Sequence, residues 1–249
     1  MRPDTSIALM SAVISLTSGA GAFRSGEDPQ FPYKVPALDA DRSPCPVINS
    51  LANHGYLPRD GKNISNEQFT TAFLTAINFD EKFVSMVAEP VFAVSTTGNP
   101  KTVNLKDLEK HNVIEHDGSL SRADIDVTGN ANKFDAVVWN GVKAHFTGPT
   151  VDSKTMAFVR SERTRVAKAT NPSFNLTEKQ VGVAYVEAAL ALGLMAGDFK
   201  NPHAPTEYMN ILFEQERFPF NEGFQRSATK ITGDQVVELA GQLRKEMVP

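Results

Sequence analysis

The residue best suited to bind a metal ion or act as a nucleophile is Cys45, the only cysteine among the 249 residues of the chain. It lies between Pro44 and Pro46. Pro46 suits the first position of a helix, because its missing N–H and fixed φ cost nothing there, and Gly55 suits a left-handed helix end. We therefore predict a helix that begins at Pro46 and ends before Gly55, with Cys45 as its N-cap.

The N-cap position determines the chemistry expected of the sulfur. The side chain of Cys45 would face the free N–H groups of Val47 and Ile48 and the positive end of the helix dipole. Both influences favour the thiolate over the thiol, and a thiolate held by backbone N–H groups is a suitable ligand for iron. A lone cysteine is also compatible with a small buried hydrophobic residue or with a thiol that joins two chains.

A second group of interest is Glu187, the one charge in the apolar stretch 181–195. The stretch is apolar on every face of a helix, which predicts a helix buried all round. No residue three or four positions away can pair with the carboxylate, so its partner must come from elsewhere. Burial without a counter-charge raises a carboxyl pKa, as in enzymes that transfer protons. A structural carboxylate bound to a loop is the other interpretation.

The segment Ile114-Glu115-His116-Asp117-Gly118-Ser119 supplies a candidate partner for Glu187. It offers oxygen ligands to a hard cation and an imidazole to a carboxylate. Taken alone, it is better explained as an acidic surface loop.

Together these segments resemble the heme-thiolate peroxidases, the family of fungal chloroperoxidase and the unspecific peroxygenases. Pro-Cys-Pro at 44–46 and Leu-Ala-Asn-His-Gly at 51–55 are similar to the family's proximal loop, and Glu-His-Asp at 115–117 and Glu187 follow in the family's order. The stretch 213–224 is similar to its late Glu-Arg-Leu-Pro-x-x-x-Gly-Trp segment, with Phe218 and Phe224 replacing Leu and Trp. His116 indicates the short-peroxygenase branch.

The resemblance implies heme b as cofactor, held through the sulfur of Cys45. Glu187 would act as general base toward hydrogen peroxide, and His116 would orient it. Glu115, Ser119 and the main-chain oxygen of His116 would bind a structural Mg²⁺ beside a heme propionate. The implied main activity is peroxide-dependent hydroxylation and epoxidation of small apolar or aromatic substrates, with one-electron peroxidase and halide-oxidising side activity.

Ile114 and Val183 are candidates for lining the substrate channel, since one precedes Glu115 and the other lies one turn before Glu187. Either residue could instead belong to the ordinary core. Three alternative functions stay open: halide oxidation as the main activity, a non-catalytic heme carrier, and an interaction module joined covalently through Cys45.

Length and composition predict one domain. With 41% hydrophobic and 22% charged residues, the chain can bury one sizeable core. A net charge of −4 without basic runs gives no reason to expect nucleic acid or an anionic membrane as partner. A single cysteine excludes an intramolecular disulfide. If Cys45 binds iron, the protein would be a monomer or a non-covalent homodimer.

Residues 1–22 resemble a secretory signal peptide. Arg2 precedes the apolar run 7–16, and Ala20-Gly21-Ala22 forms a small-residue cleavage site. We therefore predict a secreted protein with a mature domain at 23–249 and no stable membrane association after cleavage; an uncleaved anchor is the alternative. Two glycosylation sequons, at Asn63 and Asn175, agree with secretion.

The remaining chain predicts helices almost throughout. Capping boxes start helices after Ser65 and Thr177, and three further caps are expected at Asn104, Asp135 and Asp152. Pro90 should stop or kink a helix. Short strand pairs are expected only near 91–95.

Arg160, Glu162, Arg163 and Arg165 are most simply explained as one solvated helix face. The fold class we predict is mainly α, a single compact chloroperoxidase-like domain. It would enclose heme between a helix carrying Cys45 and a helix carrying Glu187.

Overall fold

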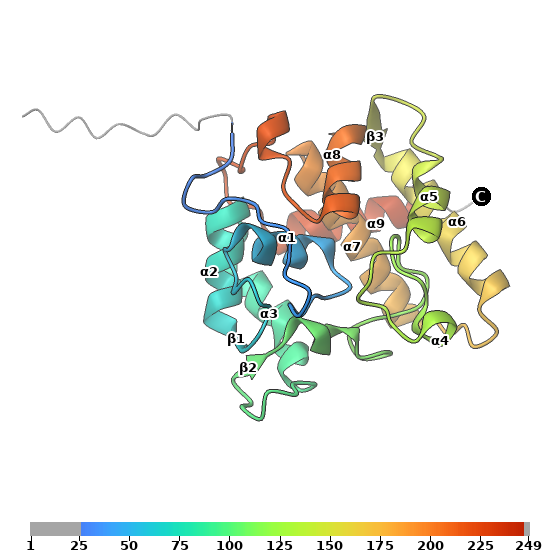
Figure 1. Cartoon of the computed structure of the whole chain (residues 1–249). Helices are drawn as coiled ribbons and strands as arrows, with labels where there is room; N and C mark the ends of the chain where they lie inside the picture. The colour runs from blue at the N-terminus through green and yellow to red at the C-terminus, as the bar shows by residue number, and fades with distance from the viewer. Residues whose placement is uncertain (1–25, 247–249) are drawn as a thin grey trace, which may run out of the picture.

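The computed structural model describes residues 26–246, and helices dominate the described chain (Figure 1). The α-helices are α1 (Pro46–His54), α2 (Asn66–Ile77), α3 (Glu81–Phe92), α4 (Ile125–Thr128), α5 (Ala136–Lys143), α6 (Ser153–Thr170), α7 (Glu178–Ala196), α8 (Thr206–Asn210) and α9 (Gly233–Glu246). Shorter helical turns are η1 (Leu105–Glu109), η2 (Ile211–Gln215) and η3 (Phe220–Glu222). The predicted mainly α class is confirmed.

Two small antiparallel sheets complete the described secondary structure. In the first, β1 (Ile64–Ser65) pairs with β2 (Thr102–Val103). In the second, β3 (Thr150–Asp152) pairs with β4 (His203–Pro205) and so joins the segments before α6 and α8. The predicted signal peptide, residues 1–22, lies outside the described residues.

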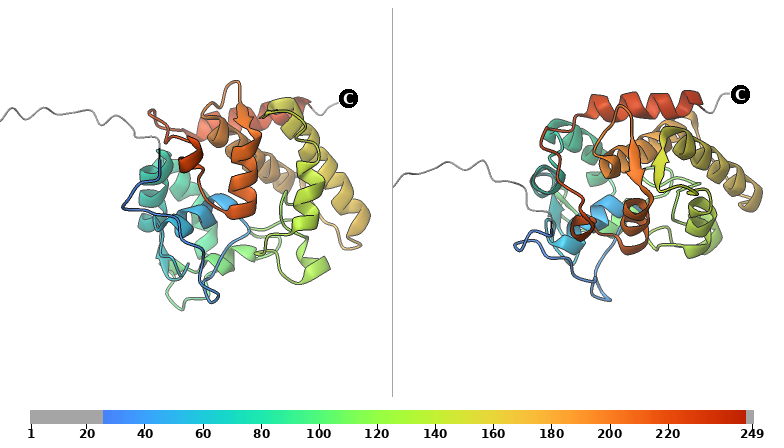
Figure 2. Two further views of the ribbon diagram at one scale, coloured as in Figure 1. Left: turned by 45° about the horizontal axis from the view of Figure 1, so that its top comes forward. Right: turned by 90° about the horizontal axis from the view of Figure 1, so that it is seen from above.

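Helix α7 forms the centre of the helical arrangement. It packs against α9, α6, α8 and β4, while α2 and α3 pack on one another. In the right-hand view of Figure 2, α9 runs along one side of the molecule from the α2–α3 pair to α6. By length and composition α7 could cross a membrane. Its packing against α6 and α9 is that of a core helix.

The predicted helix boundaries are largely confirmed, because local capping determines them. Pro46 begins α1, and Gly55 ends it with φ 86°. Capping boxes start α2 at Ser65 and α7 at Thr177. The carboxylate of Asp135 caps α5 through the N–H groups of Val137 and Val138, and Asp152 caps α6.

Three local predictions need correction. Pro90 does not stop helix α3, which continues to Phe92, because a proline near the end of a helix removes only one hydrogen bond of the last turns. The residues near 91–95 form no strand. The helix expected after Asn104 is a 3₁₀ turn.

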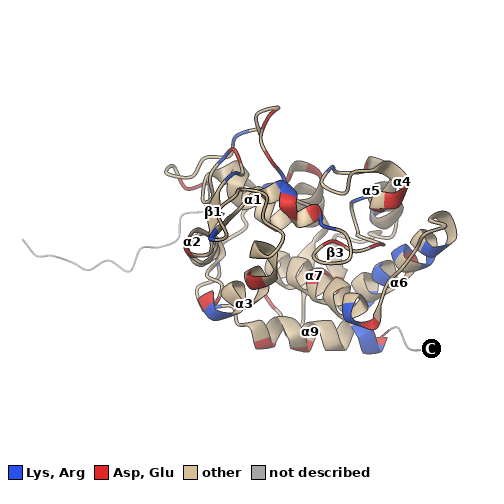
Figure 3. Ribbon diagram, turned by 90° about the horizontal axis from the view of Figure 1, so that it is seen from below, with Lys and Arg blue, Asp and Glu red and all other residues tan. Residues whose placement is uncertain are grey.

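Helix α6 carries many of the basic residues of the molecule, as Figure 3 shows. The solvated-face prediction is correct for Glu162 and Arg165, which pair at 2.6 Å on the surface. It is wrong for Arg160 and Arg163, whose exposure is 1% and 7%. These two share a helix face with Met156 and Ala167, both fully buried, so the helical period carries them inward.

Candidate functional site

Cys45 occupies the predicted N-cap of α1, with extended backbone at φ −85° and ψ 115°. Its side chain is half-buried and makes no hydrogen bond that caps the helix. Burial raises the pKa of the thiol to about 11, although the nearby N–H groups of Ile48 and Val47 lower it. The prediction that the helix start favours a thiolate is therefore wrong for the protein alone, because burial outweighs the backbone. Coordination to a metal ion would deprotonate the thiol.

Side-chain hydrogen bonds hold the loop before Cys45. The amide of Asn49 donates to Ser43 O and accepts from Ser43 N–H, both at 2.8 Å. Asn49 also donates to Glu216 Oε1 at 2.7 Å, and Asn53 donates to Glu216 O at 3.0 Å. The cysteine loop and α1 are thus fixed to the late 213–224 segment that the family resemblance singled out.

His116 and Glu187, which are far apart in sequence, meet in the structure. His116 Nε2 lies 3.3 Å from Glu187 Oε2, and Nδ1 donates to Asp117 O at 2.8 Å. The Nε2–Oε2 contact has the distance of an ion pair but not the direction of a good hydrogen bond. The bond to Asp117 O fixes the imidazole so that Nε2 faces the carboxylate.

The segment around His116 is buried, with exposures of 4% for Glu115, 2% for His116 and 0% for Asp117. An acidic surface loop is thereby excluded. Glu187 is different, because 55% of its side chain is accessible. The accessible part of the side chain faces a cavity. The surrounding protein still excludes water from the carboxylate, and this burial acts to raise its pKa. The prediction that the α7 helix is buried all round is correct only for its second half, from Ala188 to Met195.

The two partners shift each other's pKa. Burial, the largest influence on Glu187, would raise its pKa, but the charges of His116 and Arg160 outweigh burial and the pKa lies below its ordinary value. Burial would lower the pKa of His116, and Glu187 reverses this so that the pKa is raised. Glu187 is therefore ionised near neutral pH, and its negative charge favours the protonated form of His116. The expectation of a raised carboxyl pKa is therefore wrong, since a counter-charge is present.

Cys45 and the His116–Glu187 pair line the same cavity, whose volume is about 110 Å³. Its other walls are mainly apolar and include Pro44, Pro46, Val47, Leu108, Ile114, Leu120, Leu190, Ala191 and Phe213. Ligand pockets typically combine apolar walls with a few well-placed polar groups. A flat apolar cofactor with a metal centre suits this set of donors and walls.

Glu115 and Ser119 lie beside this cavity. Glu115 Oε2 accepts from His111 Nδ1 at 2.6 Å, whereas the buried Oε1 has no partner among the described residues. Ser119 Oγ lies 3.4 Å from His116 O, so two further oxygen atoms are adjacent. This set fits a hard cation, which prefers oxygen ligands. Within residues 26–246 no three acidic, His or Cys side chains gather as a metal site, so main-chain and hydroxyl oxygens would be needed.

An outer cavity adjoins the first one. Ile114, Glu115 and His116 line both, whereas Val183 lines only the outer cavity and is 36% exposed. Asn175 also lines the outer cavity. Asn175 and Asn63 are both exposed, as glycosylation requires.

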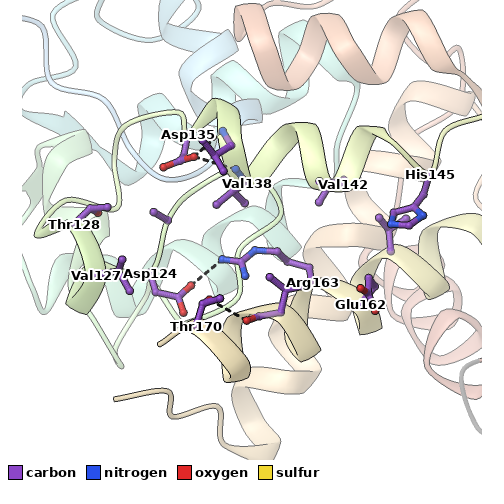
Figure 4. Close-up of a pocket in the computed structure, with 15 residues that line it drawn as sticks. Asp124, Val127, Thr128, Asp135, Val138, Val142, His145, Glu162, Arg163 and Thr170 are labelled. Atoms are coloured by element: carbon purple, nitrogen blue, oxygen red, sulfur yellow. Dashed lines mark hydrogen bonds and ion pairs between the residues drawn. The ribbon is translucent and has the colours of Figure 1, made fainter. Parts of the chain in front are cut away.

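The largest cavity lies elsewhere, between α4, α5 and α6, and is shown in Figure 4. Valine is the commonest residue in its walls, and neither Cys45 nor Glu187 lines it. At its floor Arg163 Nη2 donates to Asp124 Oδ1 at 3.0 Å. Asp124 Oδ1 also accepts from Gly118 N–H at 2.8 Å, so this pair positions the segment that carries His116.

Sequence analysis missed several residues that position the site. Arg122 is fully buried and pairs with Glu216, which in turn holds Asn49. Asp124 is 3% exposed. The spacing of Arg160 and Arg163 could have predicted their burial, because it places both residues in the apolar stripe of α6. Glu216 lies in the 213–224 stretch that the family resemblance singled out, but nothing in the sequence marks its partners, which lie far away along the chain.

Comparison with known proteins assigns the class. The profile of the family described as "Peroxidase, family 2" matches residues 31–229. Chloroperoxidase from Leptoxyphium fumago is 29% identical over 226 residues, covering 83% of this chain and 60% of the relative. Aromatic peroxygenase from Cyclocybe aegerita is 28% identical over 187 residues, covering 67% and 50%, and that from Coprinellus radians is 27% identical over 170 residues, covering 59% and 64%.

The protein is thus of the peroxidase type. It is a helical domain in which one cysteine and a His–Glu pair line a shared cavity. The chain belongs to peroxidase family 2, the heme-thiolate peroxidase and peroxygenase family that its sequence resembles. The chain spans about half to two thirds of the length of these curated relatives.

Proposed function

We propose that this protein is a secreted heme-thiolate peroxygenase that uses hydrogen peroxide to oxygenate small apolar or aromatic molecules. One observation carries the proposal: Cys45 and the His116–Glu187 ion pair line one cavity with mainly apolar walls. Membership of peroxidase family 2 supports it.

Cys45 would hold heme b through its sulfur. When bound, the heme supplies the oxidising centre, and electron donation from the thiolate favours cleavage of the peroxide O–O bond. The apolar walls formed by residues such as Leu190 and Phe213 would exclude water from the bound substrate.

Glu187 would be the general base of the reaction. Its lowered pKa keeps Oε2 ionised, so the carboxylate can take a proton from hydrogen peroxide and return it to the oxygen that leaves as water. His116 would orient the carboxylate, since its Nδ1 is fixed by Asp117 O. The accessible part of Glu187 allows peroxide to reach it from the cavity.

A structural Mg²⁺ would bind to Glu115 Oε1, Ser119 Oγ and His116 O beside a heme propionate. The support is the unpartnered, buried Oε1 of Glu115 and the nearness of the other two oxygen atoms. The cation would fix the loop that carries His116 without entering the reaction.

Substrate would enter through the outer cavity. Ile114 would line the inner end of this path and Val183 its outer end. Small aliphatic side chains at both positions would leave room for bulkier substrates than phenylalanines would. The prediction is tested by Val183→Phe, which should disfavour the bulkier members of a substrate series.

Secretion through cleavage of residues 1–22, with glycans on Asn63 and Asn175, is part of the proposal. Ser65 and Thr177, the hydroxyl residues of the two sequons, also cap α2 and α7. Each glycan would therefore sit beside a helix start. Intact-mass measurement before and after deglycosylation tests both sites.

The optical spectrum of the reduced protein with carbon monoxide tests the heme-thiolate assignment. A Soret band far to the red of that of a histidine-ligated heme is expected for the wild type and should be absent from Cys45→His. A colourless wild-type protein, expressed with hemin supplied, would contradict the whole proposal.

Activity of Glu187→Gln then separates an enzyme from a heme carrier. Loss of the general base should lower peroxide-dependent turnover by about 10²–10⁴-fold with the Soret band unchanged. Glu162→Gln, an exposed carboxylate on α6, serves as the matched control. Full turnover by Glu187→Gln would refute the assigned base, and turnover of halide in preference to organic substrates would favour the chloroperoxidase alternative.

A further inference from the structure

Arg160 has a hydrogen-bonding capacity that the protein leaves unused. The side chain is 1% exposed. Its Nη2 donates to Gly118 O and, at 3.1 Å, to Thr164 Oγ1. Nη1 is buried and has no partner among the described residues. A buried N–H group of this kind normally has a partner, so its neighbourhood indicates what the partner is.

Arg160 lines the Cys45 cavity together with Glu187. Burial lowers the pKa of the guanidinium to about 10, which still leaves it charged near neutral pH. Glu187 is already paired with His116, and Asp124 with Arg163. The positive charge of Arg160 is therefore not neutralised by a contact with either neighbouring acid.

The shape of the donor group and its surroundings define the missing partner. A guanidinium presents parallel N–H groups that match a carboxylate better than most other anions. The walls of the cavity that Arg160 lines are mainly apolar and include Leu190 and Ala191 from α7 and Leu120. Such a pocket suits an anion with one charged end and an apolar body.

We propose that Arg160 binds, through Nη1, a carboxylate of the molecule that occupies the Cys45 cavity. This inference rests on the proposed function, which gives the carboxylate two sources. One is a propionate of the heme, and the other is an organic acid substrate. Arg160 is then a binding residue of the cavity as well as a support for Gly118.

The first experiment measures how fast heme leaves the holoprotein for an excess of an apomyoglobin acceptor. If the carboxylate is a propionate, Arg160→Met releases hemin roughly tenfold faster than the wild type, because a charge-assisted hydrogen bond is lost. Arg160→Lys, which keeps the charge, should lie between the two. Arg165→Met, an exposed arginine on the same helix, should release hemin at the wild-type rate.

Hemin dimethyl ester separates carboxylate binding from loop support. Protein reconstituted with this ester has no propionate charge, so wild type and Arg160→Met should then release it at equal rates. An equal acceleration with hemin and with the ester would assign Arg160 to the support of Gly118 alone and would overturn a propionate contact.

The second experiment titrates the holoprotein optically with dodecanoate and with dodecanol. If the carboxylate belongs to substrate, Arg160→Met weakens dodecanoate binding roughly tenfold and leaves dodecanol binding unchanged, while hemin release stays at the wild-type rate. The proposal is overturned when neither experiment shows a carboxylate-specific effect. A wild-type protein that binds no heme at all would instead refute the proposed function.

Discussion

The two sides of the Cys45 cavity are built in different ways. On the cysteine side, consisting of Ser43, Cys45 and α1, local sequence fixes the backbone: Pro46 begins the helix and Gly55 ends it. On the acid side, consisting of the 115–119 loop and Glu187, long-range charged contacts position the groups. The comparison teaches that one half of the site is encoded in a short motif and the other only in the folded chain.

The cysteine side nevertheless depends on one distant residue. Glu216 accepts hydrogen bonds from Asn49 and Arg122, and its backbone is held at a left-handed φ of 49°. This residue ties the cysteine loop to the segment that follows the acidic loop. Removing the side chain of Glu216 is therefore the most severe test of this comparison between the two sides.

We expect Glu216→Ala to have the largest effect on stability. The substitution leaves the fully buried guanidinium of Arg122 without its carboxylate, which costs about 3–5 kcal/mol of unfolding free energy. Urea unfolding measures the loss, with Glu207→Ala, an exposed glutamate on α8, as control. A loss no larger than that of the control would mean that the cysteine side needs no long-range support.

A double-mutant cycle on Asp124 and Arg163 should give the next largest effect. The pair is buried and holds the acidic loop, so Asp124→Asn and Arg163→Met should show a coupling energy of about 0.5–3 kcal/mol. The same cycle on the exposed pair Glu162 and Arg165 serves as control and should show no resolvable coupling. Equal coupling in both pairs would show that the acid side does not depend on buried charge.

The smallest expected effect concerns His54, at the end of α1. Its Nε2 accepts from Phe218 N–H at 3.2 Å, so Nδ1 carries the proton and faces Phe31 O at 3.1 Å. Burial lowers the pKa of this imidazole, Glu27 acts in the opposite direction, and the charges of Arg217 and Arg59 lower it further. Protonation would place an N–H against the N–H of Phe218.

Because the pKa of His54 is lower in the folded than in the unfolded chain, the unfolded chain binds the extra proton first. Its contribution to stability is complete above pH 6.5 and is lost as pH falls below that value, by up to about 1.4 kcal/mol per pH unit. His54→Gln, which can donate and accept in the same way, should lack this dependence. Unfolding free energies of both proteins between pH 5 and 8 test it, and parallel curves would contradict a neutral, buried His54.

Much of the fold was predictable because capping and helical periodicity act over a few residues. Helix α2 begins at the predicted cap, and five of its apolar residues at helical spacing between Phe69 and Ile77 are buried. The pairing of His116 with Glu187 was anticipated from residue chemistry, an imidazole for a lone carboxylate, and from the family resemblance, because their separation in sequence gives no local signal. The lowered pKa of Glu187 was not predictable, because it depends on two charges from other segments.

The thiol pKa of Cys45 shows a second limit of prediction from local sequence. The helix start was correctly placed, and the effect of its N–H groups has the predicted sign. Burial, a property of the whole fold, decides the outcome. Arg160 was misplaced for a related reason, since charge alone suggested solvent while the period of α6 carried it into the interior.

A single segment of chain separates the outer cavity from the Cys45 cavity. This partition consists of Ile114, Glu115 and His116, which line both cavities. A substitution that widens the entrance therefore also moves the imidazole that steadies Glu187. Substrate range and turnover cannot be engineered independently at this partition. Phe213, which lines only the inner cavity, is the better position for reshaping the pocket while leaving proton transfer intact.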